Sequence, residues 1–363
     1  ILDGNEGVII INPPKEVFTK YLEKKRKYVY FEKELLKLKD MPAETVDGYR
    51  VELLANIEFP EEIKSVLEHG AEGIGLFRTE YLYLDRKDLP GEEEQFEAYK
   101  FVAQSFKGKQ TIIRTLDLGG DKIEPHLNIE SESNPALGVR AIRYAFRRKP
   151  IFKQQLRAIL RAALHGNLKI MLPMISGIAE FRQAQEVLAE VKMDLWNQGI
   201  PYKEDVEVGS MIEIPSAAVT ADLLAKEVDF FSLGTNDLIQ YSMAIDRGNE
   251  QVAYLYQPLH PAILRTIKTV ITAAHSEGIP VGMCGEMAGD PLCTLIMLGL
   301  EVDELSMNAI SIPNIKQIIR SVKYEEAVAL TNHVFSLSTY KEIENFVTHE
   351  ISHRFPEIFC SYN

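Results

Sequence analysis

The sequence predicts an α/β protein folded as a (β/α)8 TIM barrel, in which parallel strands alternate with helices. From residue 50 onward, eight short runs rich in β-branched and aromatic residues alternate with helical patterns. Eight such units are the number that closes a barrel. Charged residues also gather where these strands end, which is where barrels carry their functional residues. A doubly wound open sheet is the main alternative, but it usually has fewer strands and a glycine-rich first turn.

The first 40 residues precede the barrel pattern. Strand-like residues around a glycine-containing turn occupy residues 1–11, and two prolines end that pattern. Residues 15–40 contain neither Gly nor Pro, and their apolar residues recur at helical spacings. The chain begins with Ile1 rather than Met, so we expect a piece of a longer protein. The expected parts are the remnant of an upstream domain at 1–14, a linker helix at 15–40, and a barrel with a C-terminal helical tail at 41–363.

The expected strands and helices then follow one another along the chain. Strand patterns lie at residues 50–56, 73–77, 111–115, 169–173, 206–212, 230–234, 281–284 and 303–307. Helical patterns between them lie at residues 61–69, 92–106, 151–165, 178–197, 216–226, 261–277 and 291–298.

Composition argues against several classes of function. The 363 residues carry 40 basic and 53 acidic side chains, a net charge of −13, which disfavours nucleic acid as a partner. No apolar run approaches the ~20 residues that a membrane-spanning helix needs. The three cysteines are too few for a disulfide framework, so we expect a cytoplasmic protein. A small anion held by a few arginines remains compatible with this composition.

Four arginines fall at or near the expected mouth of the barrel. Arg78 and Arg114 follow apolar strand residues, Arg140 lies at a turn-to-helix boundary, and Arg247 comes just after the sixth strand. Guanidinium groups bind phosphate and carboxylate through paired hydrogen bonds and stay charged. Several at one mouth indicate a small polyanionic ligand, although each could instead pair with a neighbouring acid at the rim. We expect no comparable charged set at the opposite ends of the strands.

Glu213 and Asp237 are two carboxylates at the ends of adjacent expected strands, with no Cys or His beside them. Oxygen ligands on a rigid frame suit Mg²⁺, which takes the rest of its coordination from water and substrate. A salt bridge to Arg247 is the alternative role for this pair. Asp237 also closes a Gly-Thr-Asn-Asp turn whose backbone N–H groups are able to bind a phosphate.

Cys284 stands at the end of the seventh expected strand, at the same mouth. A lone cysteine is most often a small buried apolar residue, and this remains one interpretation. The alternative is a thiol that donates or removes a proton at a carbon centre. Cys293 and Cys360 have no comparable placement, and we assign them no role.

Six segments carry a resemblance to the phosphoenolpyruvate-utilising enzymes. They are Gly73-Ile-Gly-Leu-Phe-Arg78-Thr-Glu, Arg114-Thr-Leu-Asp-Leu-Gly-Gly-Asp-Lys122, Gly209-Ser-Met-Ile-Glu213-Ile-Pro, Gly234-Thr-Asn-Asp237, Asp246-Arg247-Gly-Asn and Gly282-Met-Cys284-Gly-Glu. More narrowly, residues 1–323 resemble the C-terminal phosphoenolpyruvate-binding domain of Enzyme I of the bacterial sugar phosphotransferase system. The remaining residues resemble that family less.

In that family, the barrel binds phosphoenolpyruvate and Mg²⁺, and the phosphoryl group passes to a histidine on a separate N-terminal domain, which releases pyruvate. The matching motifs imply Mg²⁺ ligands at Glu213 and Asp237, and a proton donor to the enolate at Cys284. The substrate-binding residues implied are Arg78, Arg114, Lys122, Arg140, Asn236, Asp237 and Arg247. The reaction would be the first step of sugar uptake.

The resemblance also implies partners. They are the chain's own N-terminal phosphohistidine domain, through it the histidine-containing phosphocarrier protein, and a second copy in a homodimer. The family's phosphohistidine lies in a Thr-Ser-His-Ala segment, and this sequence has none. We therefore expect the acceptor histidine upstream of Ile1, and a chain that is unable to autophosphorylate alone.

Two alternatives remain open at this stage. The chain could be the barrel of pyruvate phosphate dikinase or phosphoenolpyruvate synthase, which carry an ATP-binding domain before it. It could also be a non-catalytic dimerisation or ligand-sensing module. The complete reading frame would discriminate, because Enzyme I carries ~230–260 upstream residues with the Thr-Ser-His segment, and the dikinases carry a longer ATP-binding region.

Overall fold

A computed structural model describes residues 1–4, 7–84, 86, 88–106, 108–119 and 132–356. Its centre is a closed barrel of eight parallel strands, in which each strand pairs with the next and β10 pairs with β3. The strands are β3 (Glu52–Ile57), β4 (Ile74–Arg78), β5 (Gln110–Arg114), β6 (Asn167–Leu172), β7 (Val208–Ile212), β8 (Phe231–Leu233), β9 (Val281–Met283) and β10 (Glu304–Met307). The predicted fold class is confirmed, and all eight strands lie within two residues of their expected bounds.

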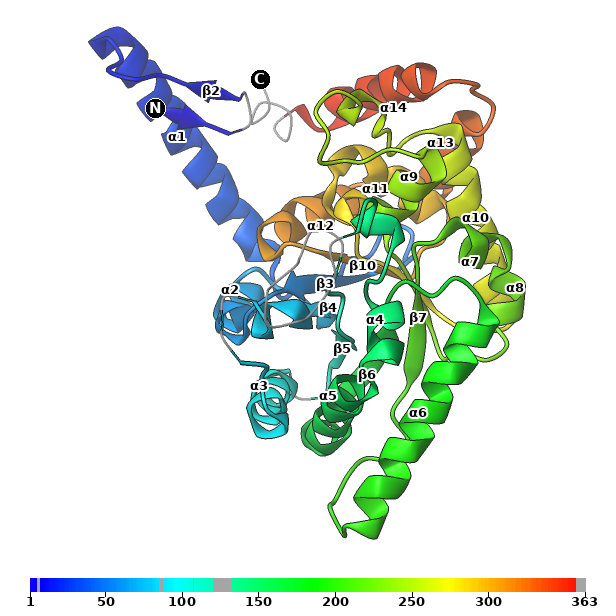
Figure 1. Cartoon of the computed structure of the whole chain (residues 1–363). Helices are drawn as coiled ribbons and strands as arrows, with labels where there is room; N and C mark the ends of the chain where they lie inside the picture. Colours follow the sequence, from blue (N-terminus) through cyan, green and yellow to red (C-terminus); the bar gives the residue numbers. More distant parts are fainter. Residues whose placement is uncertain (5–6, 85, 87, 107, 120–131, 357–363) are drawn as a thin grey trace.

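Helices cover the outside of the barrel (Figure 1). They are α2 (Ile63–Glu68), α3 (Glu92–Ser105), α4 (Ile142–Arg147), α5 (Lys149–Ala162), α6 (Ile178–Asn197), α7 (Pro215–Val219), α8 (Ala221–Leu224), α9 (Thr235–Met243), α10 (Pro261–Ser276), α11 (Pro291–Gly299) and α12 (Ile312–Arg320). Two more, α13 (Tyr324–Val334) and α14 (Tyr340–Arg354), form the C-terminal tail. The bounds expected for α6 are confirmed, whereas the single helix expected at 216–226 is two short helices, α7 and α8.

Apolar periodicity explains how these helices pack. In α5, Phe152, Leu156 and Ile159 recur at helical spacing and are buried against the strands. Arg157 and Arg161, on the other side of that helix, form ion pairs with Glu92 of α3 at 2.7 and 2.6 Å. Alternation along the strands then divides their side chains between the helix-facing core and the inside of the barrel.

A separate buried cluster fills the middle of the barrel. It comprises Leu76, Ile112, Met171, Met211, Phe230 and Cys284. The residues next to these in sequence, such as Phe77 and Ile113, belong to the larger core that the helices cover. Because this plug closes the barrel below its mouth, charged residues at the carboxyl ends of the strands face a shallow site rather than a channel.

The N-terminal residues stand away from the barrel (Figure 1). Strands β1 (Leu2–Asp3) and β2 (Val8–Ile9) pair antiparallel, and α1 (Lys15–Leu35) follows, with a 3-10 turn at Leu36–Leu38. Leu35 is buried at the barrel end of α1, whereas Phe18 and Tyr30 are exposed. We call β1, β2 and α1 the N-terminal arm. Within the described part of the chain, no helix has the length and apolar character needed to cross a membrane.

Candidate functional site

Two buried arginines and several carboxylates form an ion-pair network at the carboxyl ends of the strands. Arg114, the last residue of β5, pairs with Glu80 and with Asp117, the latter at 3.2 Å. Arg140, just before α4, donates to both carboxylate oxygens of Asp117 at 3.1 Å and to Asp237 of α9 at 3.2 Å. Asp117 therefore joins the two arginines, and the network connects four segments of the mouth.

The local electrostatics keep these arginines charged. Burial alone would lower the pKa of the Arg140 guanidinium, but Asp117 and Asp237 raise that pKa above its ordinary value. The pKa of Arg114 is likewise raised, because Glu80 and Asp117 outweigh its burial. Both guanidiniums therefore stay charged, and the carboxylates of Glu80, Asp117 and Asp237 balance them.

Glu213 lies fully buried beside this network, directly after β7. Its Oε1 accepts a hydrogen bond from the backbone N–H of Met174 at 2.6 Å, and Met174 holds a left-handed φ of 57°. Burial, together with the charges of Asp237 and Asp117, raises the pKa of Glu213 to about 8. Unless a metal cation binds beside it, this carboxyl keeps its proton at neutral pH, even with the two buried arginines of the network nearby.

The Glu213 and Asp237 pair fits a divalent cation. Both offer hard oxygen donors. Burial raises the pKa of Glu213 most, and the charges of Asp237 and Asp117 add to that rise, which a cation bound between the carboxylates would oppose. Among the described residues, no group of three or more acids, histidines or cysteines is arranged to hold a metal. Mg²⁺ commonly takes only one or two carboxylates and completes its coordination with substrate and water, so two fit.

Asn236 is held in one orientation in the first turn of α9. Its Nδ2 donates to Glu286 at 3.0 Å, and its Oδ1 accepts from the backbone N–H of Glu286 at 2.9 Å and from the hydroxyl of Tyr256 at 3.3 Å. The expected Gly-Thr-Asn-Asp turn is the N-terminus of this helix, since Gly234 is its N-cap. Backbone N–H groups in such a first turn favour anions.

Cys284 directly follows β9 and is 4% exposed. Its backbone carbonyl accepts from Asn56 at 3.0 Å, and its Sγ contacts the carbonyl oxygen of Leu233 at 3.8 Å. Burial raises the pKa of the Cys284 thiol, although a hydrogen bond to Ser232 and the charge of Arg114 oppose that rise. The thiol is therefore protonated at neutral pH, which suits a proton donor rather than a nucleophile.

The other two arginines lie further out. Arg78 pairs with Glu58 at 2.7 Å, and both side chains are about a third exposed. Arg247 is exposed, its backbone N–H donates to Gln240 at 3.1 Å, and its guanidinium makes no ion pair with any described residue. The alternative of a salt bridge from Asp237 to Arg247 is wrong, because Asp237 pairs with Arg140 instead. Lys122 lies outside the described residues.

Sequence reasoning assigned no role to five residues that contact the expected site residues. They are Glu58, Glu80, Asp117, Tyr256 and Glu286. Three of them are close in sequence to an expected site residue: Glu80, Asp117 and Glu286 lie within four residues of Arg78, Arg114 and Cys284. This proximity in sequence was the available signal that they belong to the site.

Charged residues also occur at the opposite ends of the strands, where no comparable set was expected, and among the described residues they form separate pairs. Arg50 pairs with Glu72 at 2.5 Å, and Lys169 pairs with Glu207 at 2.8 Å, both beside the strand beginnings. Each of these basic side chains is matched with a single acid, so this end of the barrel does not collect several cations around one point.

Comparisons with known proteins agree with a ligand site for a phosphorylated anion at this mouth. Residues 32–324 match the family model of the phosphoenolpyruvate-utilising enzymes, PEP-binding domain. Over 352 residues the chain is 53% identical to a phosphoenolpyruvate-protein phosphotransferase of Geobacillus stearothermophilus, covering 97% of this chain. It is 52% identical to one of Bacillus subtilis and 51% to one of Staphylococcus carnosus, each over 347 residues and 96% of this chain.

The chain spans 61% of the length of each of these relatives. Among solved structures, a citrate lyase from Burkholderia xenovorans is similar with a TM-score of 0.48 and 14% identity, over 88% of this chain and 96% of that one. The family match covers most of the barrel, including every described residue of the ion-pair network and Cys284. The chain belongs to the phosphoenolpyruvate-utilising enzymes and carries their PEP-binding domain.

Proposed function

We propose that this chain is the phosphoenolpyruvate-binding part of a phosphoenolpyruvate-protein phosphotransferase. It binds phosphoenolpyruvate with Mg²⁺, the phosphoryl group passes to a histidine outside this chain, and pyruvate is released. The observation that carries the proposal is the convergence, at one barrel mouth, of charged arginines, the Glu213 and Asp237 pair, and a protonated Cys284. The names of the relatives favour this reaction over the dikinase alternative.

The arginines divide the work of binding. Arg78 and Arg247 are the solvent-accessible guanidiniums, so they are free to meet the phosphate and carboxylate of an incoming ligand. Asn236 and the first-turn N–H groups of α9 add oriented donors. The buried Arg114 and Arg140 keep their acid partners, and would hold those carboxylates in position at the mouth. Phosphoryl transfer depends mostly on such positioning and charge stabilisation.

Glu213 and Asp237 would hold Mg²⁺, and Lys122 would add a further cation near the phosphate. The metal, when bound, would neutralise phosphate charge as the phosphoryl group departs. Glu213 must lose its proton to act as a ligand, and Asp237 beside it forms an ion pair with Arg140.

Cys284 would complete the reaction by protonating carbon. Loss of the phosphoryl group leaves the enolate of pyruvate, whose methylene carbon takes the proton from Sγ. Burial keeps this thiol protonated, and the apolar cluster around it limits access of water. The thiolate left behind lies near the charge of Arg114 until it regains a proton.

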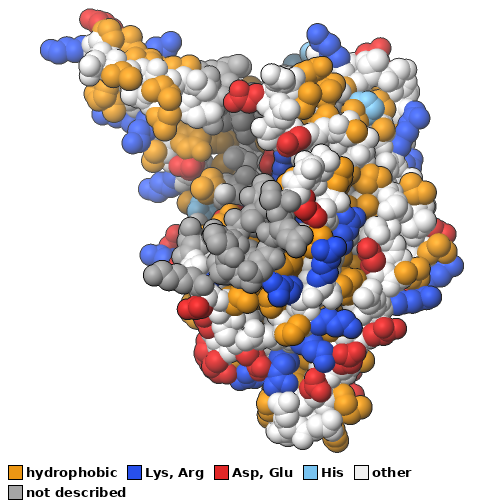
Figure 2. All heavy atoms as spheres, viewed as in Figure 1, with side chains coloured by type: hydrophobic (Ala, Val, Ile, Leu, Met, Phe, Trp, Pro, Cys, Tyr) orange, Lys and Arg blue, Asp and Glu red, His pale blue; other side chains and the backbone are white. Residues whose placement is uncertain are grey.

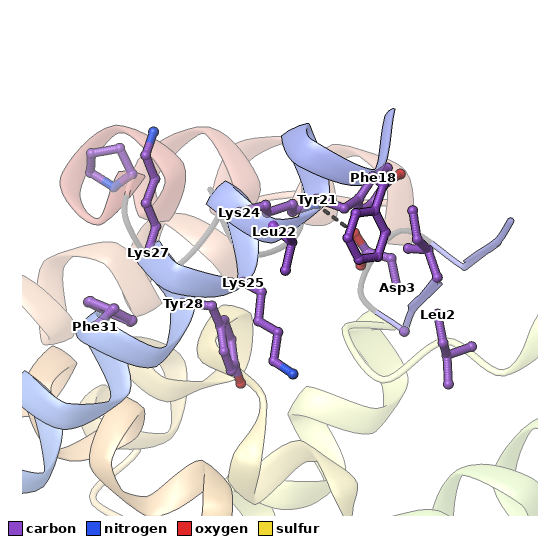
Figure 3. A pocket seen from close by; sticks show the side chains of 13 residues that line it. Leu2, Asp3, Phe18, Tyr21, Leu22, Lys24, Lys25, Lys27, Tyr28 and Phe31 are labelled. Carbon is purple, nitrogen blue, oxygen red and sulfur yellow. Dashed lines mark hydrogen bonds and ion pairs between the residues drawn. The ribbon is translucent and has the colours of Figure 1, made fainter. Parts of the chain in front are cut away.

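The domain organisation is also part of the proposal. Residues 1–14 would belong to a preceding phosphohistidine domain, residues 15–40 would link it to the barrel, and residues 41–363 would form the barrel and tail. Hydrophobic side chains gather on the N-terminal arm (Figure 2). A groove of about 950 Å³ between β1 and α1 is lined by Leu2, Phe18 and Leu22 (Figure 3). Such apolar surface is usually covered in a complete protein.

The remaining partners follow from the same proposal. The phosphohistidine domain would pass the group to the histidine-containing phosphocarrier protein, and the chain would pair as a cytoplasmic homodimer. Analytical ultracentrifugation with phosphoenolpyruvate and Mg²⁺ present tests this dimer. The measured mass should be about twice the 41.1 kDa of one chain. A single 41.1 kDa species at micromolar concentration would contradict it.

Phosphoryl transfer tests the proposed function. Incubated alone with phosphoenolpyruvate labelled at phosphorus, the chain should carry no acid-labile phosphohistidine. When the N-terminal segment of the Bacillus subtilis relative is added, label should appear on that segment and pyruvate should form in equal amount. Stable label on a histidine of this chain, or no label on the added segment, would overturn the proposal.

A further inference from the structure

The ion pair between Arg78 and Glu58 differs from the other arginine contacts at the mouth. Arg78 ends β4, Glu58 follows β3, and one Nη1 to Oε1 contact of 2.7 Å joins them. The side chains are 32% and 29% exposed. Arg114 and Arg140, by contrast, are nearly buried and each contacts two carboxylates. A ligand anion is therefore able to replace Glu58 as the partner of Arg78 without leaving a buried charge unpaired.

Glu58 is held in place independently of Arg78. Its backbone N–H and that of Phe59 both donate to Oε1 of Glu62, at 2.8 and 2.7 Å. The hydroxyl of Tyr81 also hydrogen-bonds the Glu58 carboxylate, and the Tyr81 ring packs against Phe59 at 5.1 Å. The carboxylate would thus stay at the mouth, with one partner left, after Arg78 turned away from it.

We propose that Glu58 is a positioning residue that competes with the ligand for Arg78. In the free chain its carboxylate holds the guanidinium at the mouth. A phosphoenolpyruvate anion replaces Glu58 as the partner of Arg78. Its binding free energy is reduced by the loss of this ion pair and by repulsion between the anion and the Glu58 carboxylate. When the phosphoryl group has gone, Arg78 returns to Glu58, which favours release of pyruvate. This inference rests on the proposed function.

Coulomb's law sets the direction of the effect. With Arg78 still at the mouth, a ligand oxygen that replaced Glu58 on its guanidinium would lie a few ångströms from the Glu58 carboxylate, inside the screening length of physiological salt. Removing the carboxylate charge while keeping an oxygen acceptor should therefore strengthen ligand binding. A purely structural Glu58 predicts the opposite, because a poorly placed Arg78 binds the ligand less well.

Glu58→Gln is the decisive variant, and Glu72→Gln is its matched control. Glu72 precedes β4 and pairs with Arg50, which precedes β3, so the control removes the same kind of ion pair between the same strands at the other end of the barrel. Isothermal titration with phosphoenolpyruvate and Mg²⁺ should show Kd lowered by roughly twofold to tenfold in Glu58→Gln. It should be unchanged in Glu72→Gln, and pyruvate should bind Glu58→Gln more tightly too.

Further measurements separate charge from shape. Glu58→Asp keeps the charge, so its Kd should not fall, and the gain in Glu58→Gln should shrink as salt rises. With the N-terminal segment supplied, Glu58→Gln should lower KM without raising kcat. A Kd for Glu58→Gln that is unchanged or higher, at a Tm equal to that of the unaltered chain, would overturn the inference alone. A lower Tm with weaker binding would assign Glu58 a structural role. Absence of any phosphoenolpyruvate binding by the unaltered chain would instead overturn the proposed function, and the inference with it.

Discussion

At the scale of single residues, partners decide what each charged side chain at the mouth is able to do. Arg114 and Arg140 are buried among carboxylates, so replacing either would leave an uncompensated buried charge, a loss of about 3–5 kcal/mol of stability. Arg247 is exposed and makes no ion pair among the described residues, so its replacement should spare stability. The sequence singled out all four arginines as candidates for ligand binding. It did not show that two are buried among carboxylates and two are more exposed, because burial depends on where Asp117 lies in the fold.

Cys284 provides a prediction at this scale. Cys284→Ser keeps the shape of the side chain but replaces the thiol with a much weaker acid. Phosphoenolpyruvate binding should stay within a few-fold, since a neutral thiol contributes little to holding a polyanion. Pyruvate formation with the N-terminal segment supplied should fall by the ~10²–10⁴-fold typical of a lost general acid. Near-normal pyruvate formation by Cys284→Ser would return Cys284 to a packing role.

At the scale of elements, the sequence predicted the strands better than the helix beginnings at the mouth. The strands are short runs rich in apolar residues, which their own sequence indicates. The first turn of α9 was instead expected to be a turn, because Gly, Thr, Asn and Asp favour both turns and helix N-termini. The start of α4 was expected only as a turn-to-helix boundary at Arg140, and the bounds of the helix were not predicted. It has six residues and follows Ala141, whose φ of 50° no sequence pattern indicates.

The contact between Gly285 and α9 gives a prediction for an element. A Cβ at Gly285 would lie 1.9 Å from Oγ1 of Thr235, the first residue of α9. Gly285→Ala should push the helix N-terminus and Asn236 away, weaken phosphoenolpyruvate binding, and cost about 1–3 kcal/mol of stability. Gly4→Ala is the control, since nothing lies within 4 Å of a Cβ there. Equal Kd values for phosphoenolpyruvate in Gly285→Ala and Gly4→Ala would contradict a role for the Gly285–Thr235 contact in ligand binding.

Glu304 of β10 gives a prediction of pH dependence. Burial raises the pKa of its carboxyl, although a hydrogen bond from Gln110 at 2.6 Å opposes that rise. Above about pH 4.3 the unfolded chain loses this proton while the folded chain keeps it, so the stability contribution is present at low pH and declines as pH rises. Glu304→Gln has no carboxyl to titrate, so its stability should not decline in this way. In urea unfolding, the free energy of unfolding of Glu304→Gln minus that of the unaltered chain should therefore increase from pH 4 to pH 7. If this difference stayed constant, it would contradict the raised pKa.

At the scale of the whole molecule, closure of the barrel assembles the site. The network joins segments after β4 and β5, before α4, and at the start of α9, which are separated by up to about 160 residues. The eight-strand count predicted that these ends would meet, because parallel strands bring their carboxyl ends to one edge. It could not predict which acid would pair with which arginine, since those contacts depend on side-chain packing across distant segments. The sequence indicated the segments of the N-terminal arm, but the exposure of their apolar side chains is seen only in the folded structure.

The central claim is that this mouth binds phosphoenolpyruvate together with Mg²⁺, and calorimetric titration of the chain tests it most directly. We expect one phosphoenolpyruvate to bind per chain with Mg²⁺ present and much weaker binding when the metal is chelated. Arg247→Ala, with an unchanged Tm, should weaken binding by roughly 10- to 100-fold, the contribution of a charge-assisted hydrogen bond. No binding with Mg²⁺ present, or equal affinity for the unaltered chain and Arg247→Ala, would contradict the claim.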